Sequence, residues 1–215
     1  MKNLPTQERA IRKRIALLKA AHDEFSESGF DVATAKSIAA RADVATGTFY
    51  QYFDNKDDIL RVIAENRYSE LHEQISMLNG EQNELGLSPF EIEVTVADDL
   101  RVRELFKRVL RFLYTYHLQE TELHQVLEQR RSIDLELNEI MDRGEQLMKG
   151  VVLKFIEPFS LNNSLLVAEG LYAMGEGLVH HLVFGKTKMS GDSLLDTGAE
   201  MLASYFEKSL DKTSV

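Results

Sequence analysis

The amino-acid sequence predicts an all-α protein, and three observations lead to that fold class. Only three of the 215 residues are proline, and helix-favouring residues such as Leu, Ala, Glu and Lys are frequent. Apolar residues recur every three or four positions along most of the chain, as they do on a helix with one buried face. Neither an internal repeat nor a low-complexity tail interrupts this pattern. We therefore expect about nine helices.

A first helix is predicted between Thr6, which can serve as an N-cap, and Gly29, which favours a helix end. Its apolar positions keep helical spacing, whereas its opposite side is basic. Residues 1–22 carry six Lys or Arg side chains against the single acidic residue Glu8, a net charge of +5. The whole chain has a formal net charge of -10. An acidic body therefore follows a basic head that can bind phosphate locally.

Two short helices and a long one follow in the sequence. Thr34 predicts the N-cap of the first short helix, and the second is expected over about 46–52. Asn55 and Asp58 have the spacing of a capping box, which favours the start of a longer helix. That helix is expected to stop at Gly80.

The remaining chain predicts five further helices. Residues 80–97 mix a capping-box pattern with a strand-like alternation, so we expect a loop with possible short structure there. Helical spacing resumes near Asp98, and Pro158 ends a long helix. The expected ranges are about 98–118, 123–129, 134–156, 163–184 and 190–210. Asn162 or Asn163 is the expected cap of the fourth of these helices, and Ser190 or Asp192 that of the fifth.

The composition excludes several classes of protein. Because the chain has no Cys, it has no disulfides, thiol catalysis or Cys-based zinc sites, which is typical of a reducing cytoplasm. No run of about 18 uncharged apolar residues is present, and the first twenty residues do not resemble a signal peptide. The sequence also lacks an H-E-x-x-H, a G-x-S-x-G and a Gly-rich phosphate loop. We expect a cytoplasmic protein that is not an enzyme and carries no cofactor.

Residues 34–60 contain the pattern that points to a function. Two short helices joined by a tight turn form a helix-turn-helix, whose second helix enters the major groove of DNA. The first helix is small where the two cross, and the second begins with short polar groups that can approach base edges. Hydroxyls and one cation at the flanks can bind phosphates. The small residues are Ala39, Ala40 and Ala42, the short polar groups are Thr46, Gly47 and Thr48, the expected anchors are Val44, Phe49 and Phe53, and the expected phosphate contacts are Thr34, Tyr50, Tyr52 and Lys56.

The spacing I-A-x-x-A-x-V-x-x-G-T-x-Y-x-Y-F-x-x-K-x-x-[IL]-L resembles the DNA-binding domain of the TetR family of one-component regulators. The residues that carry the resemblance are Ile38, Ala39, Ala42, Val44, Gly47, Thr48, Tyr50, Tyr52, Phe53, Lys56, Ile59 and Leu60. The resemblance covers about residues 6–65. The rest of the chain is similar to the family only in length and helical character.

This resemblance implies a homodimeric repressor that binds a palindromic DNA operator and is released by a small molecule. It implies a DNA-binding domain over 1–55 and a ligand-binding and dimerisation domain over 56–215, linked by a helix over about 56–79. Base contacts are then expected from Thr46, Gly47, Thr48 and Gln51. Asp43 stands where the family usually has glycine in the turn, and it brings a negative charge towards DNA. Asp tolerates a left-handed backbone better than most residues.

The resemblance also implies a ligand cavity in the C-terminal part. Aromatic and Met side chains are frequent there, and such a lining suits an apolar or aromatic ligand. The acidic balance favours a cationic or neutral ligand over an anionic one. The candidate lining residues are Phe106, Phe112, Tyr116, His117, Met141, Met148, Tyr172 and Met174.

The last two helices are the expected dimer interface. Gly170 and Gly177 are two turns apart on one side of a helix and permit another helix to approach closely. Packing within one subunit is the alternative. The expected interface residues are Gly170, Ala173, Gly177, Leu178, Leu182, Leu195, Leu202 and Phe206.

Two alternatives remain open at this stage. Glu176 and His180 share a helix face and have the ligand types of a metal site, but the adjacent His180 and His181 at a helix end are more typical of capping or an interface, so we expect no metal. The acidity and Asp43 leave open a helical small-molecule binding protein or enzyme whose head does not bind DNA. An activator and a repressor cannot be separated by sequence.

Overall fold

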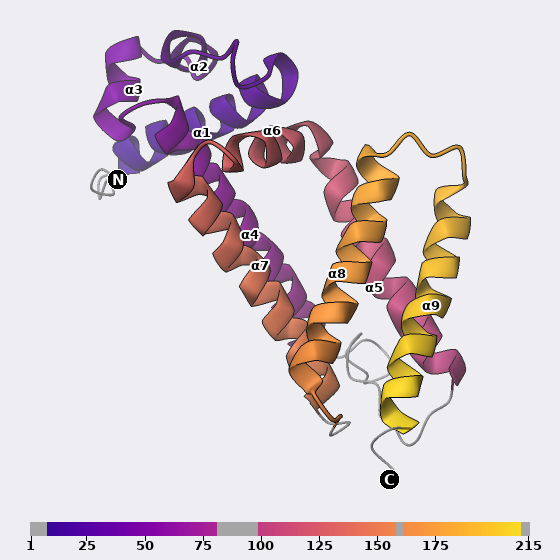
Figure 1. The fold of residues 1–215 in the computed structure, drawn as a ribbon. Helices are drawn as coiled ribbons and strands as arrows, with labels where there is room; N and C mark the ends of the chain where they lie inside the picture. The colour runs from indigo at the N-terminus through magenta and orange to yellow at the C-terminus, as the bar shows by residue number, and fades with distance from the viewer. Residues whose placement is uncertain (1–7, 81–98, 158–160, 212–215) are drawn as a thin grey trace. The chain divides into compact units, whose positions relative to one another are not determined.

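The computed structural model describes residues 8–80, 99–157 and 161–211, and within these ranges the chain forms nine helices and no strand. The expected all-α fold is therefore confirmed (Figure 1). None of the helices in these ranges is both long and apolar enough to cross a membrane. The helices are α1 (Glu8–Ser28), α2 (Ala35–Arg41), α3 (Thr46–Tyr52), α4 (Lys56–Gly80), α5 (Asp99–Gln119), α6 (Thr121–Arg131), α7 (Leu135–Ile156), α8 (Ser164–Phe184) and α9 (Gly191–Asp211).

The structure confirms the predicted helix starts at Thr34 and Asn55, where local hydrogen bonds cap the helix. Thr34 and Ser37 form a reciprocal capping box at the start of α2. The Asp58 backbone N–H donates to the Asn55 side chain at 2.9 Å at the start of α4. Asn163 precedes α8, but at φ +59° it caps through its backbone carbonyl and makes no side-chain cap bond. The expected cap at Thr6 lies outside the described residues, as does the expected loop over 80–97 apart from Gly80, which ends α4.

By its internal contacts the chain divides into two compact units. The first contains residues 1–70 and 120–144, so the domain boundary expected at residue 55 falls inside it. In this unit α1 packs on α2 and α6, and α2 packs on α3. Its largest fully buried side chains include Phe25, Phe49 and Phe53. These three aromatic residues belong to one apolar core together with side chains of α1, α2 and α4.

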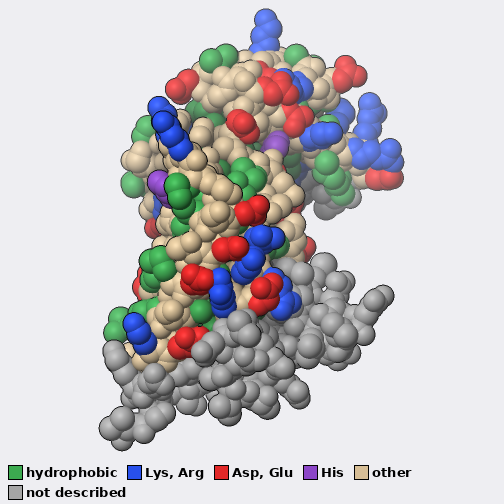
Figure 2. Space-filling view, turned by 90° about the vertical axis from the view of Figure 1, so that its right-hand side faces the viewer, with side chains coloured by type: hydrophobic (Ala, Val, Ile, Leu, Met, Phe, Trp, Pro, Cys, Tyr) green, Lys and Arg blue, Asp and Glu red, His purple; other side chains and the backbone are tan. Residues whose placement is uncertain are grey.

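The second unit contains residues 71–119 and 145–215, in which α5 packs against both α8 and α9. Phe106, Leu110 and Phe206 lie in its apolar core. Acidic and basic side chains are interspersed on the face shown in Figure 2. Three ion pairs one turn apart join α5 to α9: Arg103 with Glu200, Lys107 with Asp196 at 2.7 Å, and Arg111 with Asp192 at 3.2 Å.

Part of the expected dimer interface requires correction. Leu195, Leu202 and Phe206 are at most 4% exposed and belong to the core of the second unit. Their side chains pack within the subunit, because α9 turns this apolar stripe towards α5. Ala173 and Gly177 of α8, by contrast, are exposed.

Candidate nucleic-acid interface and effector cavity

A tight turn joins α2 to α3. The backbone N–H groups of Asp43 and Val44 donate to carbonyls of α2, at 3.2 and 3.0 Å. Asp43 adopts φ +52°, within the left-handed region that favours glycine. Asp43, which stands where the TetR family usually has glycine, therefore has the left-handed backbone for which glycine is suited.

Helix α3 has a buried face and an exposed face. Phe49 is fully buried, and its ring centroid lies 5.8 Å from that of Phe53. Thr46, Gly47 and Gln51 are exposed, while the expected base contact Thr48 is half-buried. The buried anchor Phe49 and the exposed base contacts Thr46, Gly47 and Gln51 thus lie on opposite sides of this short helix.

Gly47 has no packing role within the chain. A Cβ atom at this position would meet no heavy atom within 4 Å. Glycine inside a helix costs roughly 1 kcal/mol relative to alanine. Packing within the chain therefore does not require a glycine here. The missing side chain would instead allow another molecule to approach the backbone closely.

The expected phosphate contacts have different surroundings. Tyr50 is exposed, whereas Tyr52 is half-buried against the core. The Thr34 hydroxyl accepts a hydrogen bond from the Ser37 N–H at 3.0 Å, as an N-cap does. The Lys56 ammonium donates to the carbonyls of Phe30 at 2.7 Å and Ala33 at 3.2 Å. These two carbonyls stabilise the Lys56 cation in the first turn of α4, so no phosphate is needed to explain its position.

Two cations from different helices lie over the ring of Phe30. The Lys56 Nζ of α4 and the Arg130 guanidinium of α6 are each 4.4 Å from the centre of its ring. Arg130 also pairs with Asp57 at 2.7 Å. No local sequence pattern marks this cluster, because Arg130 is 100 residues away from Phe30.

A second polar cluster joins α1 and α4 to the residue before α6. His22 Nε2 is 3.0 Å from a Glu120 carboxylate oxygen, and Arg67 pairs with the same carboxylate. The hydrogen bond to Glu120 raises the pKa of His22 above its ordinary value. The same bond lowers the pKa of the Glu120 carboxyl. Together with the Phe30 cluster, this arrangement ties α6 to the helices that support α3.

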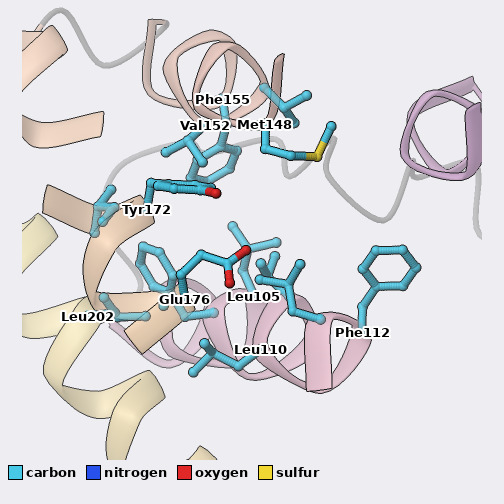
Figure 3. A pocket seen from close by; sticks show the side chains of 15 residues that line it. Leu105, Leu110, Phe112, Met148, Val152, Phe155, Tyr172, Glu176 and Leu202 are labelled. Atoms are coloured by element: carbon cyan, nitrogen blue, oxygen red, sulfur yellow. The ribbon is translucent and has the colours of Figure 1, made fainter. Parts of the chain in front are cut away.

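The second unit contains an apolar cavity of about 110 Å³ (Figure 3). It is comparable with the roughly 150 Å³ apolar cavities that bind benzene. Of the fifteen described residues that line it, only Tyr172 and Glu176 carry a side-chain oxygen. Four expected lining residues are among the fifteen, namely Phe106, Phe112, Met148 and Tyr172.

The other four expected lining residues lie elsewhere. Met141 is 1% exposed in the core of the first unit, so its assignment to the cavity is corrected. Met174 is 38% exposed on α8. Tyr116 packs beside the cavity residue Met148, and His117 is buried on α5. Met141 has the same helical spacing as a cavity residue, and only the packing of α7 distinguishes the two.

Sequence reasoning missed Glu176 as a cavity residue. In Figure 3 its carboxylate faces the space among the apolar side chains. A helical pattern gives no signal that a carboxylate on a largely apolar helix faces inwards. The buried His117 of α5 lies close to it, with Nε2 3.7 Å from a carboxylate oxygen.

These features define the class of protein: a helix-turn-helix protein with an apolar cavity in its C-terminal unit. Residues 17–63 match the family model described as "Bacterial regulatory proteins, tetR family". The N-terminal part of the chain is therefore similar to the DNA-binding domain of the TetR family. The similar proteins found are transcriptional regulators rather than enzymes.

Two relatives are similar within the N-terminal part. The uncharacterized HTH-type transcriptional regulator YvdT of Bacillus subtilis is 38% identical over 68 residues, which are 31% of this chain and 35% of that protein. The HTH-type transcriptional regulator HbdR of Aromatoleum is 44% identical over 54 residues, 25% of this chain and 24% of that protein. The chain thus spans about a third or less of these relatives.

Solved structures match over almost the whole chain. A putative TetR-family regulator from Mesorhizobium loti has a TM-score of 0.69 at 17% identity, covering 94% of this chain and 98% of that one. Reduced NemR from Escherichia coli has a TM-score of 0.65 at 17% identity, covering 90% and 97%. At this identity the matches establish the fold.

The left-handed turn residue leads to a first prediction. We expect Asp43→Gly to be more stable than Asp43→Ala by about 1 kcal/mol, because a Cβ at positive φ is strained and alanine lacks the polar side chain that eases it. Asp43→Asn removes only the charge and should unfold like the parent. Urea unfolding of the three variants measures the difference. Equal stability of the Gly and Ala variants would contradict the strain.

Proposed function

We propose that the protein is a ligand-responsive transcriptional repressor that acts in the cytoplasm and binds a palindromic operator as a homodimer. The observation that carries this proposal is the two-sided helix α3, with Phe49 fully buried and Gly47 open to the outside. A recognition helix needs an anchored inner face and an outer face that can enter the major groove.

The expected contacts divide into two kinds. Thr46, Gly47, Thr48 and Gln51 face base edges, and Thr34, Tyr50, Tyr52 and Lys56 lie towards phosphates. Tyr50 is the best placed of the phosphate group, because its side chain is 51% exposed. Lys56 contributes chiefly by holding the carbonyls of Phe30 and Ala33.

The effector proposed for the cavity is a small apolar or aromatic molecule. The apolar lining supports this choice, and Glu176 adds a preference for a neutral or cationic polar end over an anionic one. Such a ligand can release DNA only if it binds more tightly to a conformer whose two heads no longer fit the operator.

A dimer through α8 and α9 is proposed on the basis of exposed apolar side chains. Leu166 is 70% exposed and Met201 59% exposed. A Cβ at Gly170 would lie 3.2 Å from the Tyr205 hydroxyl, so this part of α8 and the end of α9 share one surface. An isologous contact between two such surfaces forms a four-helix interface.

Selection of bound duplexes from a random DNA pool tests the proposed function. We expect an inverted repeat with half-site centres roughly 34–36 Å apart, or a near multiple, and an affinity that falls steeply with salt. If a folded, dimeric, ligand-free protein enriches no sequence at low salt, the regulator proposal is wrong and a small-molecule binding protein remains.

The recovered site permits a second prediction. Gln51→Ala is expected to weaken binding by about 1–3 kcal/mol and to relax the preference at one base position, because a side chain that reads a base edge is lost. Tyr50→Phe is the matched comparison on the same helix. It should weaken binding to all sequences alike. Competition binding with single-base operator variants separates the two effects, and an unchanged preference in Gln51→Ala excludes its base contact.

A further inference from the structure

Two histidines and a carboxylate meet in the second unit, beside the apolar cavity. His117 comes from α5, and Glu176 and His180 come from adjacent turns of α8. One Glu176 oxygen lies 3.7 Å from His117 Nε2 and 3.3 Å from His180 Nε2. One ring nitrogen of His117 lies within 4.8 Å of one ring nitrogen of His180. The sequence alone places Glu176 and His180 on one helix face. The fold brings His117 to them, although it precedes Glu176 by 59 positions in the chain.

The hydrogen bond between His117 and Leu113 determines which ring nitrogen of His117 carries the proton. The other ring nitrogen, Nε2, faces the Glu176 carboxylate. The His117 Nδ1–H donates to the Leu113 carbonyl, with the nitrogen 2.8 Å from the oxygen. In the neutral ring, Nε2 therefore carries a lone pair directed towards Glu176. The side chain of His117 is only 5% exposed. A lone pair and a carboxylate oxygen repel each other unless a cation lies between them, and a bound metal ion is one such cation.

The distances are also close to those between two ligand atoms bound to one small metal ion. Zinc bonds of about 2.0–2.2 Å in tetrahedral geometry place neighbouring ligand atoms about 3.3–3.6 Å apart. The two observed separations from Glu176 are 3.3 and 3.7 Å. A histidine that ligates a metal usually donates its other ring N–H to a carbonyl or carboxylate, which fixes its tautomer. The contact from His117 to Leu113 has that form.

We propose that His117, Glu176 and His180 bind one divalent transition-metal ion of the zinc type. Two imidazoles and a carboxylate suit such an ion, whereas Mg²⁺ and Ca²⁺ prefer oxygen ligands throughout. Three protein ligands leave a fourth position open. Glu176 also lines the apolar cavity, so the open position lies at its polar end. A ligand with an apolar body and one donor atom, such as a carboxylate or phenolate, can complete the coordination there.

Zinc titration of the tag-free, metal-stripped full chain tests the proposal. Calorimetry with Zn²⁺ alone should give one ion per chain, and Co²⁺ should give the visible spectrum of a tetrahedral site. Glu176→Gln and His180→Ala should each weaken zinc binding at least about 100-fold, because each removes a ligand, whereas loss of an outer-shell partner costs 10–100-fold. Far-UV circular dichroism checks that both variants fold.

His181→Ala is the matched control, because this exposed histidine is the next residue on α8 and is no part of the cluster. Its zinc affinity should equal that of the parent. Zinc binding that survives both ligand substitutions, or that is lost in His181→Ala, overturns the proposal, as does the absence of binding by the folded parent. The titration contains no DNA, so its failure is distinct from a failure of the proposed regulatory function. Only an effect of zinc on operator affinity depends on that function.

Discussion

Replacing Phe49 with alanine is expected to lower the free energy of unfolding by about 3–5 kcal/mol, the range for removing a buried phenylalanine side chain. Phe49 is fully buried and packs against Phe53 in the core of the first unit. Helix α3 has seven residues, too few for a helix to persist in water without tertiary packing. Sequence-specific DNA binding should therefore disappear together with the anchor. Urea unfolding and operator titration measure the two losses.

Tyr50→Ala is the appropriate comparison for Phe49→Ala. It removes the neighbouring aromatic side chain, which is 51% exposed. We expect the free energy of unfolding to change by less than about 1 kcal/mol, as is usual for surface positions, while DNA affinity falls. A Phe49→Ala variant that unfolds like Tyr50→Ala would show that the inner face of α3 does not anchor it.

The double substitution of Ala173 and Met201 with arginine is expected to produce a folded monomer that has lost its operator affinity. Both side chains are exposed, so the subunit can accommodate the charges. In a two-fold interface each arginine meets its own copy or the other arginine, and burying such like charges is unfavourable. Without two linked heads, binding should approach the non-specific level, which is typically weaker by a factor of about 10³ or more.

Light scattering and operator titration test this expectation. Leu147→Arg is the control, because Leu147 is an exposed apolar residue of α7, outside the proposed interface, and is 51% exposed. It should leave the protein dimeric and able to bind its operator. A double variant that remains dimeric would assign the interface to another surface.

Local sequence patterns predicted the elements of the DNA-binding unit. Thr34 and Asn55 mark helix starts that the structure confirms, because capping depends on residues within one turn. The helix-turn-helix spacing separated the buried Phe49 from the exposed Gly47 and Gln51. Each of these features depends on neighbours close in the chain, and the helical period fixes their directions.

The role of Lys56 could not be derived in that way. The sequence indicated an unexplained cation at a helix start, and a phosphate was the simplest partner. The structure supplies carbonyls 26 and 23 residues earlier in the chain instead. A partner at that distance depends on how the segment after α1 folds back.

The sequence by itself determined the helices, the turn and the two faces of α3. The tertiary structure alone decided that Met141 belongs to the first core, that Leu195 is inside the subunit, and that Glu176 faces both the cavity and His117. The physical reason is range. Periodicity and capping are set within a few residues, whereas cavity walls and clusters of polar groups form only where helices distant in the sequence pack together.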